Sequence, residues 1–130
     1  MALKLLRRKP PEFQVLAVDD TFIAPTILMG GVGAITASAH VCTNLFARMI
    51  DAARTGYSDT VMALANALLP VVTTGFAEPN PACWEAALHA AGQIATATLR
   101  LPMSQASDAA TQRLLDSIND AHDLASALSP

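Results

Sequence analysis

FQVLAVDD at residues 13–20 and GGVGAITASAHV at residues 30–41 decide the fold of this chain. Each contains a short run of aliphatic or β-branched residues that ends in polar residues. A segment with helical spacing follows each run, which is the pattern of strand–helix units in a parallel sheet. The sequence therefore predicts an α/β fold, rich in helix, with buried strands at 13–18 and 33–38.

Helical periodicity accounts for most of the remaining chain. We expect helices at residues 1–9, 22–29, 44–55, 58–75, 81–91 and 107–125. Three of these helices should end at glycines, namely Gly56, Gly75 and Gly92. The expected N-caps, whose side chains accept a backbone N–H, are Asp20 or Thr21, Thr43 and Asn80.

Composition excludes several classes of protein. At 130 residues, of which 52% are hydrophobic, the chain can form one domain with a core. The net charge of −3 argues against nucleic-acid binding. The one basic cluster, at residues 4–9, is also short and lacks aromatic residues. Cys42 and Cys83 form no CxxC pair and indicate free thiols in a reducing compartment.

Membrane insertion and secretion are also disfavoured. The apolar stretch after the N-terminal charges is broken by prolines and acids, so no signal-peptide core is present. The uncharged run at residues 21–47 is long enough to span a bilayer, but proline, glycine and polar residues interrupt it. We therefore expect a cytoplasmic protein with no membrane partner and no nucleic-acid partner.

Chemically capable side chains occur in groups too small for a catalytic or metal site. Ser38 and His40 would share one face of a strand, but no acid is placed to orient the imidazole. Glu85 and His89 share one helix face, yet two ligands do not make a metal site. We interpret these pairs as structural or surface residues and expect no metal and no cofactor. Arg100 is expected to anchor the fold by capping helix carbonyls.

Two further segments, EPNP at 78–81 and RLPM at 100–103, complete a recognisable order. Together with the two strand segments, they resemble the C-terminal half of the dihydrodipicolinate synthase and N-acetylneuraminate lyase family, over roughly residues 10–118. These are class I pyruvate-dependent aldolases built on a TIM (β/α)8 barrel. The resemblance implies a partial barrel, the last two β/α units, at 1–41, and the last barrel helix with a C-terminal helical region at 42–130.

The resemblance also implies a set of substrate-binding residues. Pyruvate binds in this family at the C-terminal face of the barrel, where the residues that end each strand line the pocket. Val18 and Ile35 fall at such positions, and Asp19 lies just beyond the first strand, so we expect these three residues to bind substrate. The family usually has glycine where Val18 stands, and this bulkier side chain should crowd the pyruvate pocket.

The residue that would carry the chemistry has no counterpart in this chain. The family's Schiff-base lysine lies on an earlier barrel strand, whereas the only lysines here, Lys4 and Lys9, precede the first strand in a charged stretch. Such a lysine must be desolvated or otherwise perturbed to be a free amine near neutral pH. We therefore expect no catalytic residue in this chain and no lyase activity from it alone.

The leading hypothesis is one half of a split or truncated lyase that condenses or cleaves pyruvate with an aldehyde. Two parallel strands are too few for a stable sheet, so we expect self-association or a lysine-bearing N-terminal half to cover them. Pyruvate would bind only in the reconstituted barrel. Two alternatives remain open: a non-catalytic interaction module that modulates assembly of a full-length paralogue, and an inert remnant of a frameshifted gene.

Overall fold

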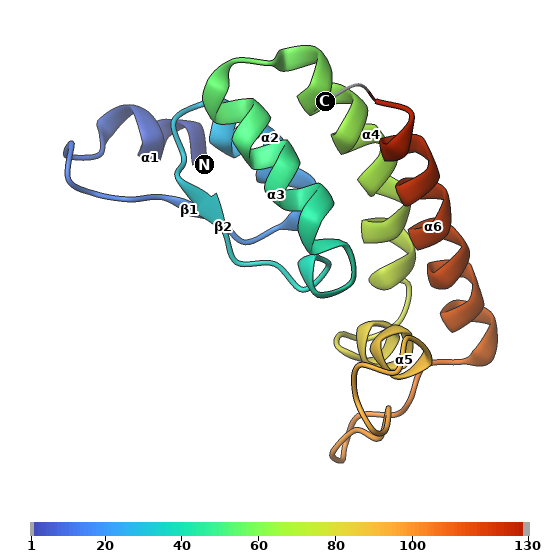
Figure 1. Ribbon diagram of the computed structural model, residues 1–130. Helices are drawn as coiled ribbons and strands as arrows, with labels where there is room; N and C mark the ends of the chain where they lie inside the picture. Colours follow the sequence, from blue (N-terminus) through green and yellow to red (C-terminus); the bar gives the residue numbers. More distant parts are fainter. Residues whose placement is uncertain (1, 129–130) are drawn as a thin grey trace.

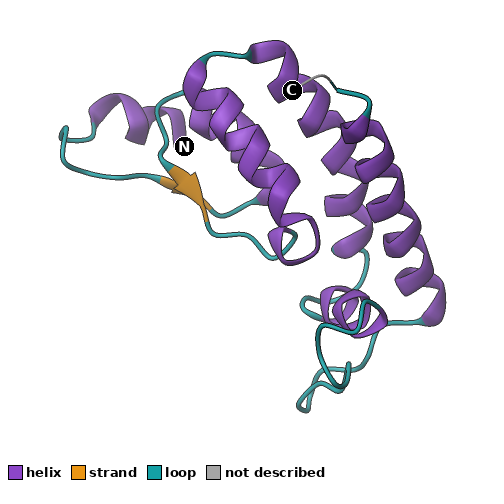
Figure 2. Ribbon diagram, viewed as in Figure 1, coloured by secondary structure: helices purple, strands orange, loops and turns teal. Residues whose placement is uncertain are grey.

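Two short strands, six α-helices and one 3₁₀ turn form the regular structure of residues 2–128, the part of the chain that the computed structural model describes (Figures 1 and 2). In chain order they are α1 (Ala2–Arg8), β1 (Leu16–Ala17), η1 (Asp20–Phe22), α2 (Ile23–Leu28), β2 (Gly33–Ala34), α3 (Ala39–Thr55), α4 (Ser58–Gly75), α5 (Ala82–Ala90) and α6 (Asp108–Ser126). The predicted helix at 1–9 and the predicted region at 42–130 reach Met1, Ser129 and Pro130, which lie outside the described residues.

The two strands pair in parallel, but over a shorter length than the predicted strands at 13–18 and 33–38. The paired residues are Leu16 with Gly33 and Ala17 with Ala34. The N–H of Ile35 adds a hydrogen bond to the carbonyl oxygen of Ala17 at 2.8 Å. Within residues 2–128 no third strand joins this ladder. A ladder of two strands is weakly held by itself, and this explains why the regular pairing is short.

Three predicted helix ends are confirmed. Gly56 follows α3 in a left-handed conformation, with φ of 84°, and its N–H bonds to the carbonyl oxygen of Ala52. Gly75 is the last residue of α4. Ser107 precedes α6, and its Oγ accepts the N–H of Ala110 at 3.2 Å. Local sequence signals therefore place the C-terminal ends of α3 and α4 and the start of α6 correctly.

The predicted N-cap after the first strand is wrong by one residue. Asp19, rather than Asp20 or Thr21, caps η1, because its Oδ1 accepts the N–H of Thr21 at 3.0 Å. Asp20 is drawn away from the cap into a buried hydrogen bond with Ser38. A long-range partner therefore decides which of the two adjacent aspartates serves the turn.

Two further predicted caps are also wrong. α3 begins at Ala39, before the predicted cap Thr43, whose hydroxyl instead donates to the Ala39 carbonyl within the helix. A non-helical backbone at Cys42, with φ of −133° and ψ of 40°, kinks α3 next to this threonine. α5 begins at Ala82 without a side-chain cap, so Asn80 does not take the predicted role.

The helices pack around α4, which lies between α3 and α6, while α5 lies across one end of this layer (Figure 1). Fully buried side chains from three helices meet in the core, namely Ile23, Leu64, Val71 and Leu114. Ala17 of β1 belongs to the same buried cluster, so one core joins the strands to the helices. No helix of residues 2–128 is long and apolar enough to cross a bilayer.

An arginine does anchor helix carbonyls, but it is not the predicted one. Arg48 of α3 donates to the carbonyl oxygens of Ala125 and Leu128, at 3.2 and 3.5 Å, and so caps the C-terminal end of α6. Arg100 is exposed in the loop after α5, which projects away from the helices (Figure 1). Its side chain makes no hydrogen bond within the described residues, so the predicted capping role of Arg100 is wrong.

Candidate functional site

The two strands expose one face of their sheet. Val15 and Ala17 are buried on the face that the helices cover. Leu16, Val18 and Ile35 alternate to the opposite face, where they are 46%, 72% and 64% exposed. This face is apolar, and in the isolated chain solvent covers it.

Val18 and Ile35 lie side by side on this exposed face. The register pairs Ala17 with Ala34, and both predicted residues come one step later along their strands. In a parallel ladder, residues at the same register project to the same side. The structure therefore brings together two of the three predicted substrate-binding residues at the C-terminal ends of neighbouring strands.

The third predicted residue, Asp19, lies at the same end but is partly engaged. Its Oδ1 accepts hydrogen bonds from the N–H and the hydroxyl of Thr21, at 3.0 and 2.6 Å. Asp19 is exposed, whereas its neighbour Asp20 is buried. Only Asp19 therefore presents a carboxylate to solvent beside Val18.

An open groove of about 710 Å³ begins at Val18 and Asp19, just after β1, and runs to the last turn of α4, while Ile35 lies outside its lining. Its walls come from two regions, residues 18–21 after β1, and Val72 and Thr73 of α4 with Phe76 just after this helix. From the sequence, Phe76 is interpreted as a core residue rather than as part of an aromatic ligand shelf with Trp84, and Val72 as part of the apolar face of its helix. The available signal was the helical spacing of Val72 and Phe76 just before the EPNP turn, which puts both on one helix face.

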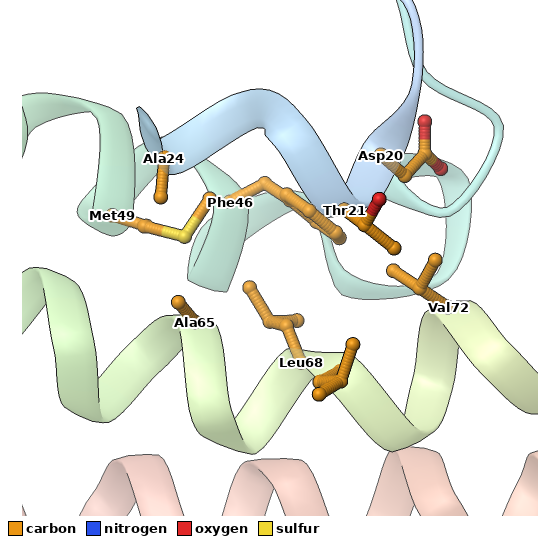
Figure 3. Close-up of a pocket in the computed structure, with 9 residues that line it drawn as sticks. Asp20, Thr21, Ala24, Phe46, Met49, Ala65, Leu68 and Val72 are labelled. Atoms are coloured by element: carbon orange, nitrogen blue, oxygen red, sulfur yellow. The ribbon is translucent and has the colours of Figure 1, made fainter. Parts of the chain in front are cut away.

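A second, much smaller cavity lies between η1, α2, α3 and α4 (Figure 3). Its lining includes Phe46, Met49 and Leu68, and its volume is about 30 Å³. A cavity of this size holds about one water molecule, and its walls are mainly apolar. It is therefore a packing defect of the core rather than a ligand site, and the groove is the candidate site.

Other reactive side chains form no site. His40 lies exposed in the first turn of α3, so the predicted strand face shared with Ser38 does not exist. His89 contacts the carbonyl oxygen of Ile94 at 3.2 Å through Nδ1, and no metal-binding group is found within the described residues. Cys42 and Cys83 are buried free thiols, as predicted. Burial raises the pKa of Cys42 to about 11, so this thiol is not a nucleophile at neutral pH.

Two parallel strands with helices packed against one face place the chain in the α/β class. Comparison with known families identifies the family within this class. The chain belongs to the dihydrodipicolinate synthetase family, which matches residues 1–121. This finding confirms the resemblance predicted from the four sequence segments.

Individual relatives cover most of this chain, while the chain covers a minor part of each relative. The 4-hydroxy-tetrahydrodipicolinate synthase of Cyanothece sp. is 34% identical over 117 residues, which are 90% of this chain and 39% of the relative. The enzyme of the same name from Neisseria gonorrhoeae is 38% identical over 101 residues, 78% of this chain and 34% of the relative. The chain therefore spans less than half the length of these relatives.

Solved structures share the fold. The 4-hydroxy-tetrahydrodipicolinate synthase of Methylacidiphilum fumariolicum SolV superposes with a TM-score of 0.87 over 96% of this chain and 41% of its own, at 21% identity. The dihydrodipicolinate synthase of Aquifex aeolicus gives a TM-score of 0.85 over 95% of this chain and 41% of its own, at 23% identity. At these identities the likeness concerns the fold alone.

Proposed function

We propose that this chain forms the C-terminal part of the barrel of a pyruvate-dependent aldolase or lyase of the 4-hydroxy-tetrahydrodipicolinate synthase type. The observation that carries the proposal is the placement of Val18 and Ile35, side by side on an exposed face at the carboxyl ends of parallel strands. In (β/α)8 enzymes substrate is bound by residues that end the barrel strands. Val18, Ile35 and the exposed carboxylate of Asp19 would then form one wall of the pyruvate site.

The exposed sheet face supports a partial barrel. A barrel strand pairs on both edges, and its inner face is filled by side chains from the other strands. Here the backbone N–H and C=O of Val18 bond to nothing within residues 2–128. Leu16, Val18 and Ile35 face solvent. The missing strands would lie outside these 130 residues, on the same polypeptide or on another one.

The Schiff-base lysine would also come from outside these residues. Lys4 and Lys9 are the only lysines of the chain. Lys4 is exposed on α1 and Lys9 follows this helix half-exposed, so neither ammonium group is desolvated in the way that imine formation at neutral pH requires. We therefore propose that the isolated chain has no lyase activity and that pyruvate binds only when a lysine-bearing N-terminal half completes the barrel.

Co-expression with such an N-terminal half tests the proposal. The two parts should purify as one complex and condense pyruvate with an aldehyde. Val18→Gly should increase this activity, because it removes a side chain that crowds the wall of the pocket. Leu101→Gly, at a loop position that is 92% exposed, is the matched control and should leave the activity unchanged.

The same exposed face also favours a second candidate function. A non-catalytic module could use Leu16, Val18 and Ile35 to bind a full-length paralogue and modulate its assembly, or to associate with a second copy of itself. A folded complex that stays inactive with either valine or glycine at position 18 would reject the lyase proposal. That outcome would favour the interaction module.

A further inference from the structure

Asp20 is the one buried charged side chain among the described residues, with 6% of its surface exposed. Its Oδ2 accepts two hydrogen bonds from Ser38, one from the hydroxyl and one from the backbone N–H at 3.1 Å. Ser38 is fully buried and lies 18 residues further along the chain. A buried carboxylate is costly unless it is paired or well hydrogen-bonded, so these two bonds are what make the position tolerable.

The hydroxyls at this point form a chain with a fixed direction. Thr36 Oγ1 lies 3.0 Å from Ser38 Oγ. Ser38 Oγ donates its single hydroxyl proton to Oδ2 of Asp20. Thr36 must then be the donor to Ser38. The segment after β2 is therefore joined to the segment after β1 by a chain of hydrogen bonds that runs from Thr36 through Ser38 to Asp20.

This contact closes the sheet just beyond the candidate pyruvate wall. Asp20 comes two residues after Val18, and Ser38 comes three residues after Ile35. The last backbone bond between the strands is the one from Ile35 N–H to the Ala17 oxygen. Beyond it, the hydrogen bonds that join the two strand ends within the described residues are those between Asp20 and Ser38.

The orientation of Asp20 argues against a direct role with substrate. Asp19, and not Asp20, caps η1 and faces solvent. Figure 3 shows the Asp20 carboxylate turned away from Leu68 and Val72 of α4. Its accepting oxygen is already occupied by Ser38. Asp20 borders the groove, but the oxygen that bonds to Ser38 is committed to holding the strand end, and this is the role that the contacts support.

We propose that Asp20 is a positioning residue, which acts through Ser38 to fix the spacing of Val18 and Ile35 at the pyruvate wall. The effect on pyruvate rests on the proposed function, whereas the effect on the strand ends belongs to the chain alone. The two parts of the inference can therefore be tested separately.

Amide hydrogen exchange on the full chain tests the contact itself. In Asp20→Ala the amides of Ser38 and Ile35 should exchange about tenfold faster than in the wild type, the factor expected for one lost hydrogen bond to a charged group. Amides of α4 and α6 serve as the internal reference and should not change. Asp20→Asn should retain slow exchange, because the amide oxygen can accept both bonds from Ser38.

Imine trapping in the complex with the lysine-bearing half tests the effect on the site. Asp20→Ala should raise the half-saturating pyruvate concentration about tenfold while the amount of adduct at saturation stays the same. Asp20→Asn should restore wild-type behaviour to within about threefold. Asp120→Ala, at an exposed acid of α6, controls for loss of charge and should have no effect.

If Asp20→Ala does not fold, Ser38→Ala takes its place. This variant loses the hydroxyl bond to Asp20 and keeps the backbone bond. Its half-saturating pyruvate concentration should also rise. An unchanged half-saturation in a variant whose Ile35 exchange is accelerated would overturn the positioning role. Failure of Asp20→Asn to rescue would overturn it as well. A wild-type complex without any adduct would reject the proposed function, and the exchange data would then decide alone whether Asp20 holds the strand ends.

Discussion

Gly75, the last residue of α4, lies directly against the indole of Trp84 in α5. A methyl group added at Gly75 would be 1.9 Å from Cη2 of Trp84, which is 2% exposed and cannot move into solvent. Overpacking costs about 1–3 kcal/mol, against a gain in helix propensity of up to about 1 kcal/mol for alanine. We expect Gly75→Ala to lower the free energy of unfolding by about 1–2 kcal/mol in urea titrations.

Asn66→Ala is the matched control for this substitution, at an exposed position of the same helix. It should change the free energy of unfolding by less than about 0.5 kcal/mol. A Gly75→Ala protein as stable as the wild type would show that the α4–α5 contact is looser than described.

The family resemblance, rather than the strand pattern, put Val18 and Ile35 forward as neighbours. The structure does place them side by side, whereas their role in binding substrate stays a prediction. The Asp20–Ser38 contact was not predictable, because nothing in a single sequence pairs residues 18 positions apart. The same limit explains why Arg48, which caps α6 from α3, was missed in favour of Arg100.

At the scale of the elements, side-chain hydrogen bonds connect the turn before α5 to the start of α6. Glu78 accepts the hydroxyl of Ser107 at 2.6 Å and its N–H at 3.0 Å. These two bonds, with a smaller contribution from the Arg113 cation, hold the pKa of Glu78 below its ordinary value of 4.5. The turn and the helix are therefore joined most strongly when this carboxyl is ionised.

This contact makes part of the stability depend on pH. A carboxyl whose pKa is lower in the folded state stabilises the fold above its unfolded pKa, and the contribution is lost as pH falls through the folded pKa. The wild type should exceed Glu78→Gln in free energy of unfolding by a constant amount at neutral pH. The difference should shrink below a pH of 4.5, the ordinary pKa of this carboxyl.

Ser107→Ala provides the control for the pH experiment, because it removes the hydroxyl that donates to Glu78. In the Ser107→Ala background, the free energies of unfolding of the proteins with Glu78 and with Gln at position 78 should differ by an amount that depends less on pH. Ser107→Ala should itself cost about 1 kcal/mol through loss of the N-cap of α6. A difference that does not change with pH in the wild-type background would contradict the role of Glu78.

Element types and most helix C-termini could be predicted, whereas N-termini often could not. Glycines ended α3 and α4 as expected, since the signal lies in the residue itself. The start of α3 at Ala39 was hidden by the kink at Cys42, which shortens the regular apolar periodicity. A cap candidate such as Thr43 can instead bond to its own helix backbone, and only the fold decides between these uses.

At the scale of the whole molecule, several large apolar side chains around the sheet are exposed to solvent. Phe13, Phe22 and the face residues Leu16, Val18 and Ile35 are all exposed. We expect the isolated chain to self-associate or to bind a hydrophobic dye, as measured by sedimentation velocity and fluorescence. Ile35→Lys should reduce both effects, while Leu101→Lys, far from the sheet in sequence and exposed, should not. A compact monomer that binds no dye would contradict this expectation.

At the scale of the whole molecule, the predicted α/β class and family resemblance were within reach of the sequence, because the order of four short segments carries both. The groove could not be predicted from the sequence, because its second wall comes from the end of α4 and depends on how the helices pack against the strand ends. The predicted division into 1–41 and 42–130 stays a prediction. Buried residues from both parts share one core.

The central claim is that the chain supplies one wall of a pyruvate site whose lysine lies elsewhere. Treatment with pyruvate and borohydride, followed by intact mass measurement, tests this directly, first on the chain alone and then on its complex with a lysine-bearing half. The account predicts no adduct on this chain in either sample and a pyruvyl adduct on the lysine-bearing half in the complex. A stoichiometric adduct on Lys4 or Lys9, or a folded complex without any adduct, would contradict it.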